Sequence, residues 1–208
     1  MSQHLPAMFI GDSSGLDFLN SLATPVDTPV DWIADGDGLL DWLKQANLVP
    51  REVLDSIKRA AKPGELDKVA EQARDWREWF RGFVRKHMGR RLTPRALREL
   101  EPLNSLLARD ETFGQLVHVH HGDHDHRELR RVRRWRTPQS LLLPIGEALA
   151  TFICEANFAD VKACEGASCT LLFVDRTRRK GRRWCSMAVC GNRAKQVAHR
   201  HRLKAQPH

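Results

Sequence analysis

Apolar residues three and four positions apart recur through most of the chain and predict a largely helical fold. The longest stripe, from Gly64 to Met88, predicts a central helix. Its Trp76 and Trp79 are expected in the core rather than on a surface that stacks nucleotide bases. Shorter stripes begin next to residues that favour a helix start, and they predict four further helices at 36–48, 51–62, 94–107 and 138–156.

Between Phe113 and Trp135 the apolar period changes to two, as in a strand whose side chains alternate between faces. Gly122 and Asp123 separate the two alternating segments. Because glycine and aspartate are common in tight turns, we expect a β-hairpin near residues 113–135.

After residue 160, apolar segments at 161–164 and 170–174 predict two short strands. A basic amphipathic segment then predicts a helix that starts at Ser186 or Asn192. We therefore expect an α+β protein that is mainly α with a small β-hairpin. It is predicted to contain a helical N-terminal domain at residues 1–160 and a small C-terminal ββα-like module at residues 161–208, with separate cores.

The charge distribution supports this division. The 208 residues carry a net charge of +8, but residues 161–208 contain 12 Lys or Arg and two acids, a net +10, while residues 1–160 carry −2. Localised positive charge of this kind favours a polyanionic partner. A module of this size rarely buries enough apolar surface to fold without a staple, such as a structural metal ion.

Four cysteines in this module form two matching pairs, Cys164 with Cys169 and Cys185 with Cys190. Four residues separate the members of each pair, and 15 residues separate the pairs. Structural zinc is held by four such ligands in a tetrahedron, so the spacing predicts one structural Zn²⁺ rather than scattered core thiols. Phe173 and Trp184 are expected to flank the ion and exclude water.

The chain has no run of 18 apolar residues, and its start lacks the basic and long apolar segments of an export signal. We therefore expect a cytoplasmic protein without a membrane partner. Cytosolic thiols stay reduced, which disfavours disulfides between the two pairs. The fifth cysteine, Cys154, is expected as a buried core thiol because it lies in the apolar run 149–158.

The C-terminal residues closely resemble the bacterial CGNR zinc-finger family, named for the tetrapeptide at residues 190–193. The resemblance rests on Phe173-Val174-Asp175, on residues 182–187, and on the tetrapeptide followed by Lys195. It implies four thiolate ligands and DNA binding. Thr177 stands where such sequences often have serine.

The N-terminal half is similar to the ABATE domain that usually precedes this finger. The supporting residues are Leu16-Asp17-Phe18-Leu19-Asn20, the segment 40–48 around Trp42-Leu43, and Leu103-Asn104. Asn47 stands where a glycine often ends the helix. Because members of this family are regarded as stress-induced transcription regulators, the resemblance implies a DNA-binding regulator whose N-terminal domain senses a ligand or mediates oligomerisation, as a homodimer for example.

Arginine and lysine bind nucleic acids mainly through phosphates, with release of counterions. We expect a cationic loop to contact the DNA backbone and the basic helix to lie beside it. RNA is a less favoured partner, and no residue can be assigned to a base. The predicted nucleic-acid contacts are Arg178, Arg179, Lys180, Arg182, Arg183, Arg193, Lys195, Arg200 and Arg202.

A second hypothesis makes the N-terminal domain a ligand-binding receptor or a small enzyme, with the finger docking to RNA or protein. No nucleophile and base pattern, glycine-rich phosphate loop or HExxH motif supports catalysis, so we do not expect an enzyme. The segment from His118 to His126 is rich in histidine but is expected as an exposed hairpin tip rather than a metal site. Asp17 and Asn20 are expected as helix caps rather than groups of a ligand pocket.

Overall fold

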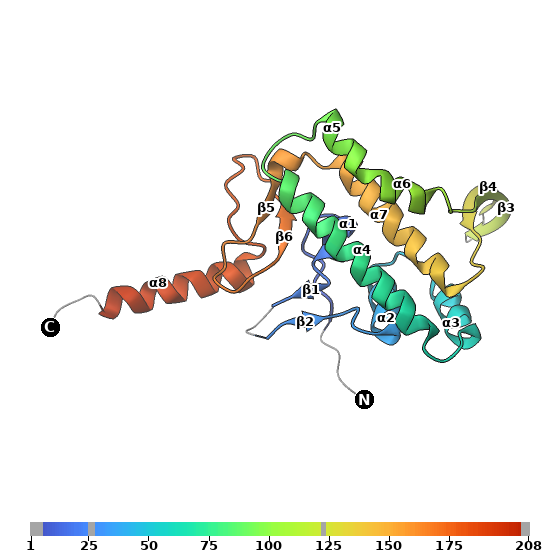
Figure 1. The fold of residues 1–208 in the computed structure, drawn as a ribbon, viewed down its shortest axis with the longest axis horizontal. Coiled ribbons are helices and arrows are strands. Elements are labelled where there is room, and N and C mark those ends of the chain that lie inside the picture. Colours follow the sequence, from blue (N-terminus) through green and yellow to red (C-terminus); the bar gives the residue numbers. More distant parts are fainter. Residues whose placement is uncertain (1–5, 25–27, 122–123, 205–208) are drawn as a thin grey trace.

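The predicted central helix is α4, Glu65–His87, in a computed structural model that describes residues 6–24, 28–121 and 124–204 (Figure 1). Val69, Ala73, Phe80 and Val84 line its buried face, and none of the four is exposed to solvent. The helix starts after Gly64, whose positive φ of 72° suits glycine. Because α4 packs against α1 and α2, its apolar stripe forms the centre of the helical body (residues 6–160).

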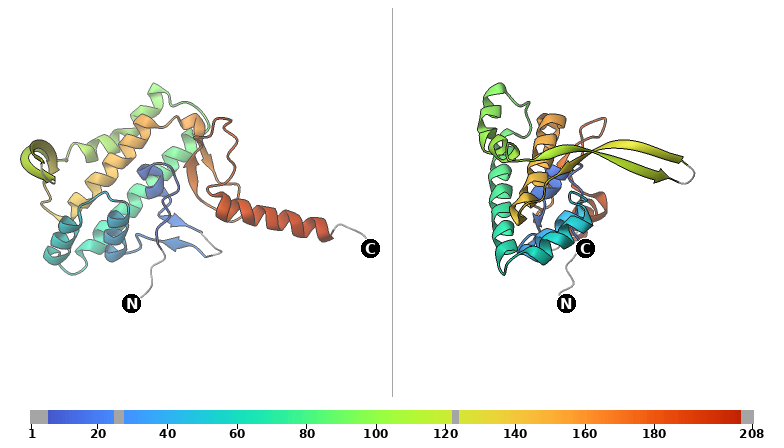
Figure 2. Two further views of the ribbon diagram at one scale, coloured as in Figure 1. Left: turned by 180° about the vertical axis from the view of Figure 1, so that it is seen from behind. Right: turned by 90° about the vertical axis from the view of Figure 1, so that its right-hand side faces the viewer.

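Further helices and two strand pairs complete this body, with α4 along one side of it (Figures 1 and 2). The helices are α1 (Ser14–Leu19), α2 (Gly36–Gln45), α3 (Arg51–Ala60), α5 (Pro94–Leu97), α6 (Glu101–Leu107) and α7 (Leu142–Glu155). The strands are β1 (Leu22–Ala23), β2 (Val30–Asp31), β3 (Thr112–His121) and β4 (His124–Arg133). The C-terminal finger (residues 161–204) contains β5 (Val161–Ala163), β6 (Leu172–Val174) and α8 (Asn192–Lys204).

The fold class expected from the sequence is confirmed, with three differences in detail. The segment 94–107 forms α5, a 3-10 turn and α6 instead of one helix, because Pro102 can occupy only a first helical turn. The strands β1 and β2 were not expected, since two-residue strands carry no periodic signal. Cys154 was expected in the core but is exposed on α7. Trp76 and Trp79 pack against the core, as expected, and contact each other edge to face.

The predicted hairpin consists of β3 and β4, which pair antiparallel from Thr112 opposite Arg133 to the described end of the ribbon. It projects away from the helices, as the right-hand view of Figure 2 shows. Its base is fixed to the body because Arg133 makes ion pairs with Asp110 and Glu147, both shorter than 3 Å. In the described part of the chain, no helix is long and apolar enough to cross a membrane.

The helical body and the finger share one hydrophobic core. A single cluster of buried residues includes Phe80 and Phe152 of the body together with Leu172, Phe173 and Cys185 of the finger. The expectation of separate cores is therefore wrong. The division of the chain at residue 161 stays a prediction.

Asn20 connects the two parts directly. Its side-chain amide donates to the carbonyl oxygen of Leu172 at 2.9 Å and accepts from the backbone N–H of Leu172 at 3.0 Å. The side chain is buried, so it satisfies two backbone groups that water does not reach. Asn20 thus fixes strand β6 on α1, which is more than the capping role that we expected.

Asp17 holds the segment before α1. Its carboxylate accepts a hydrogen bond from the backbone N–H of Gly11 at 2.7 Å, and the Gly11 carbonyl accepts from the backbone N–H of Val174 in β6. Burial raises the pKa of Asp17 to about 6, against the lowering effect of backbone hydrogen bonds from Gly11 and Ile10. Asp17 is therefore a buried structural carboxyl and not a cap.

We predict that Asn20→Ala lowers the free energy of unfolding by about 2–4 kcal/mol, because it leaves two buried backbone groups without partners. Urea unfolding monitored by circular dichroism measures this change. Asn104→Ala is a matched control, since Asn104 is exposed on α6 and its loss should cost less than about 0.5 kcal/mol. Equal losses in the two variants would contradict the role of Asn20.

Asp17→Asn should gain stability relative to the parent protein as the pH rises. The folded pKa of Asp17 lies above the unfolded value, so its stabilising contribution is full below about pH 4 and is lost as the pH rises through about 6. The asparagine oxygen still accepts from Gly11. Urea unfolding at pH 4.5 and 7.5 should show a relative gain on the order of 2 kcal/mol, whereas a pH-independent difference rejects the assignment.

Candidate metal centre

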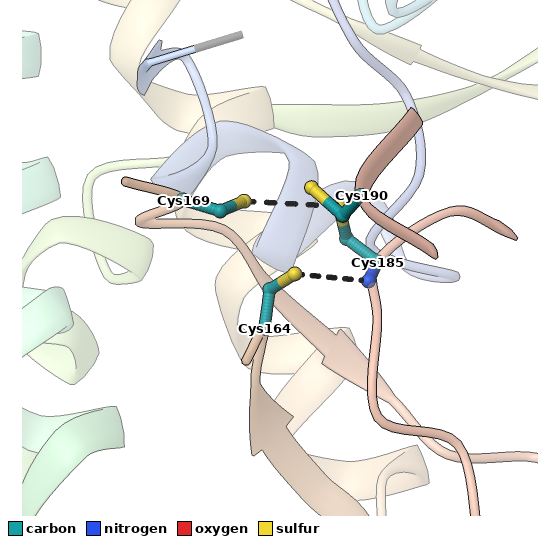
Figure 3. A group of neighbouring side chains, drawn as sticks. All are labelled: Cys164, Cys169, Cys185 and Cys190. Carbon is teal, nitrogen blue, oxygen red and sulfur yellow. Dashed lines mark hydrogen bonds between the residues drawn. The ribbon is translucent and has the colours of Figure 1, made fainter. Parts of the chain in front are cut away.

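The four paired cysteines meet in one place, between the loops of the finger (Figure 3). Cys164 directly follows β5, and Cys169 lies in the loop that leads to β6. Cys185 ends the cationic loop, and Cys190 lies in a single π-helical turn that precedes α8. Because β5 and β6 pair antiparallel, the loop that connects them holds Cys164 and Cys169 at one end of the sheet. The cationic loop leaves from the other end and runs back, so that the N–H of Glu165 donates to the carbonyl oxygen of Arg183.

The sulfur atoms have the spacing that a tetrahedral zinc site requires. All four lie within 4.8 Å of one another. The Sγ atoms of Cys169 and Cys185 are 3.8 Å apart, and those of Cys185 and Cys190 are 3.6 Å apart. A tetrahedron with Zn–S bonds of about 2.3 Å has edges of roughly 3.8 Å. The donor set therefore fits one zinc ion, which when bound would cross-link the two loops.

Backbone groups support the sulfur atoms from outside the cluster. The N–H groups of Cys185 and Gly166 point at the Sγ of Cys164, at 3.3 and 3.5 Å. Such hydrogen bonds orient a thiolate and stabilise its charge. A β-carbon at Gly166 would lie 3.0 Å from the β-carbon of Cys169 and 3.2 Å from the Sγ of Cys190, so this position favours glycine.

The thiols influence one another's protonation. The hydrogen bond with Cys185 lowers the pKa of Cys169 to about 5, and the same contact raises the pKa of Cys185. Burial raises the pKa of Cys190 to about 12. The cluster thus accepts one negative charge readily, while loss of all four protons needs a cation among the sulfur atoms.

The cationic loop is shaped by Asp175, which is fully buried at the end of β6. Its carboxylate accepts from the N–H and hydroxyl of Thr177, from the N–H of Arg182 and from the ammonium group of Lys162, at 2.6–3.0 Å. Burial alone would raise the pKa of Asp175, but these hydrogen bonds outweigh it and hold the pKa well below its ordinary value. Thr177 supplies the hydroxyl that a serine would supply there.

Three of the predicted nucleic-acid contacts are bound within the protein. Arg182 makes an ion pair with Asp12 at 2.5 Å, and its guanidinium lies 4.2 Å above the ring of Phe173. Lys180 makes an ion pair with Asp160 at 2.9 Å. Arg183 contacts two partners at once, the carboxylate of Glu165 at 2.6 Å and the ring of Trp184 at 4.9 Å.

The other predicted contacts lie at the surface of the loop and of α8. Arg178, Arg179, Lys195 and Arg200 are exposed and make no ion pair with any residue that the structure describes. Arg193 is half-buried, lines a groove beside Cys169 and Cys190, and interacts within the protein. Arg202 belongs to α8, but its side chain lies outside the described part. The basic helix starts at Asn192, the second of the two predicted positions.

Sequence reasoning did not single out Asp12 and Lys162, which help to fix the finger, and it assigned Asn20 only a capping role. Two of these three residues have partners far away along the chain: Asp12 pairs with Arg182, and Asn20 with Leu172. The sequence pattern of Phe173-Val174-Asp175 did mark Asp175, although not its role. A carboxylate directly after a short apolar strand and before a cationic loop is the signal that could have indicated it.

In the histidine-rich hairpin segment, His118, His120 and His126 are exposed, as predicted. His118 and His120 both contact Asp125, and the distance from the His118 Nε2 to the Asp125 Oδ2 is 3.4 Å. Within the described ranges, however, the cysteines alone bring three or more ligand atoms close enough to hold a metal ion. The side chains of His121 and His124 lie outside the described part.

The fold and the sulfur cluster define a helical protein with a zinc finger of four cysteines at its C-terminal end. Two family models cover nearly the whole chain. The ABATE model, described as "Putative stress-induced transcription regulator", matches residues 12–156, and the CGNR zinc finger model matches residues 161–203. The chain therefore belongs to the ABATE family and carries a CGNR zinc finger. A search of curated proteins finds no match.

Cys185→Ser should reduce the zinc content of the purified protein well below one ion per chain, because three thiolates bind zinc more weakly than four. The shared core predicts that the whole chain loses stability, not the finger alone. Metal analysis and thermal unfolding measure both effects. Cys154→Ser is the control, since this exposed thiol on α7 lies outside the cluster. Retention of one tightly bound zinc in Cys185→Ser contradicts the ligand set.

Proposed function

We propose that this protein is a zinc-containing transcription regulator whose CGNR finger binds DNA. In this proposal Cys164, Cys169, Cys185 and Cys190 hold one structural zinc ion, which fixes the cationic loop and the start of α8. The chain acts without catalysis of its own. The description of the ABATE family supports a role in transcription, and the finger supplies the charge for a polyanionic partner.

The observation that carries this proposal is the cationic surface next to the thiol cluster. Arg178 and Arg179 project from the loop between Asp175 and Cys185, and Lys195 and Arg200 lie on α8. Helix α8 extends away from the body, so its sides are accessible to a large partner (Figure 1). Because Arg182 and Lys180 are bound within the protein, we assign them to the framework that presents the exposed cations.

DNA is the partner that this arrangement favours. Arginines on a rigid loop can contact phosphates, while an α-helix of ordinary diameter fits the major groove. The loop is rigid because the buried Asp175 closes it from both ends. One small finger buries little DNA surface, so sequence specificity would need a second copy or a longer footprint.

The helical body has room for the sensing role in this proposal. A cleft of about 410 Å³ lies where the start of α1, helix α7 and the finger meet. Its lining includes Ser13, Thr151 and Glu155 of the body, and Arg176 of the finger. Arg176 also donates to the carbonyl oxygen of Asp12 at 2.8 Å. A small polar effector bound there would contact both parts of the chain, inside the cytoplasm in our proposal.

Reversal of charge in Arg178→Glu/Arg179→Glu should weaken binding to duplex DNA and flatten the dependence of log affinity on log salt by about 2, because two phosphate contacts are lost. Fluorescence anisotropy at several salt concentrations measures both quantities. The matched control Arg51→Glu/Arg59→Glu makes the same change of net charge on exposed positions of α3. This helix lies at the opposite end of the molecule from α8 (Figure 1).

The control should leave the salt slope unchanged. Its lower net charge should cause only a small loss of affinity that is similar at all salt concentrations. The proposal fails if the zinc-loaded protein binds no duplex at low salt. Equal effects of the two variants would place the DNA contacts elsewhere on the molecule.

A further inference from the structure

The β-hairpin formed by β3 and β4 is an arm that pairs with no other described strand. Two-stranded ribbons are marginally stable in water unless a third strand or another element packs on them. Here the sheet consists of β3 and β4 alone, within the residues that the structure describes. Leu116 and Leu129 face each other across the ribbon, and 78% and 68% of these residues' surfaces are exposed.

The two edges of the arm differ sharply in charge. From Thr112 to His121, β3 contains no Asp, Glu, Lys or Arg, and it is rich in β-branched and aromatic residues. By contrast, β4 contains four arginines and two acids over the same length. Charged residues on an edge strand prevent pairing with another chain, whereas an uncharged edge with high β-propensity promotes it. Only the β4 edge is protected in this way.

We propose that β3 is a self-association edge, which pairs antiparallel with β3 of a second copy of this chain. A two-fold axis near Val117 would place Leu116 opposite His118 of the second copy and would bring no like charges together. The result is a four-stranded sheet with a β4 strand at each outer edge. The same pairing of β4, about Glu128 opposite Val117, would place two Glu128 carboxylates opposite each other, which disfavours it.

Charge also distinguishes a second copy from nucleic acid as the occupant. An arm that binds DNA needs several unpaired cations, but Arg130 pairs with Glu128 at 2.9 Å and Arg133 pairs with Asp110 at 2.7 Å. Of the four β4 arginines, Arg127 and Arg131 alone make no ion pair with a described residue. The edge that is open for pairing is the uncharged one. The proposal does not depend on DNA binding by the finger.

Sedimentation of the full-length, zinc-loaded protein over a range of concentrations tests the proposal. The parent protein is expected to form a dimer, and Leu116→Lys should raise the dissociation constant of that dimer at least about tenfold. Leu129→Lys is the matched control, because it places the same charge on the cross-strand neighbour at the outer edge. It should change the dissociation constant less than about threefold.

The variant Gln115→Glu tests whether a weaker dimer results from charge on β3 and not from unfolding of the hairpin. The carboxylate that this variant introduces would face Arg130 across the ribbon and so favour the hairpin, yet it adds charge to the β3 edge. It should weaken the dimer as well. Hydrogen exchange should show that β3 amides gain protection with protein concentration in the parent protein but not in Gln115→Glu.

Three outcomes overturn the proposal. The first is a parent protein that stays monomeric at all concentrations. The second is a dimer that Leu129→Lys weakens as much as Leu116→Lys. The third is protection of β3 amides by added duplex DNA in a monomer, which makes the arm a nucleic-acid contact.

Discussion

The whole C-terminal part of this structure depends on four sulfur atoms that must share a small volume. Thiolates at this spacing repel one another, so the cluster is stable as a fully ionised group only around a cation. The strands β5 and β6, which pair beside the cluster, are only three residues long each. The order of the cationic loop and of the start of α8 therefore follows from metal coordination together with the buried carboxylate of Asp175.

The finger packs against the helical body and is not an independent unit on a linker. Strand β6 is buried on the helical body, Asn20 completes its hydrogen bonding, and Arg182 reaches back to Asp12. These contacts join the sulfur cluster to α1 through a few residues. Asp17 and Gly11 belong to the same contact region. A structural change in the body around α1 would therefore alter the position of the loop that carries Arg178 and Arg179.

Much of this architecture could be predicted from local sequence patterns. The apolar stripe of α4, the alternation in β3 and β4, and the spacing of the cysteines each depend on residues close together in the chain. The long-range contacts could not be predicted, because Asn20 and Leu172 are 152 positions apart and neither residue type signals the other. For the same reason, the sequence does not distinguish Arg182, which contacts Asp12, from the exposed arginines beside it. The exposure of Cys154 depends on which face of α7 points to solvent. The sequence does not show this face, because apolar residues in this run have only a weak helical period.

The hairpin leaves the body after Asp110 and returns at Arg133, and an ion pair closes the chain at that point. Its ends are therefore held together whatever lies between them. An element attached in this manner can lengthen, shorten or change its surface during evolution without disturbing the helices or the sulfur ligands.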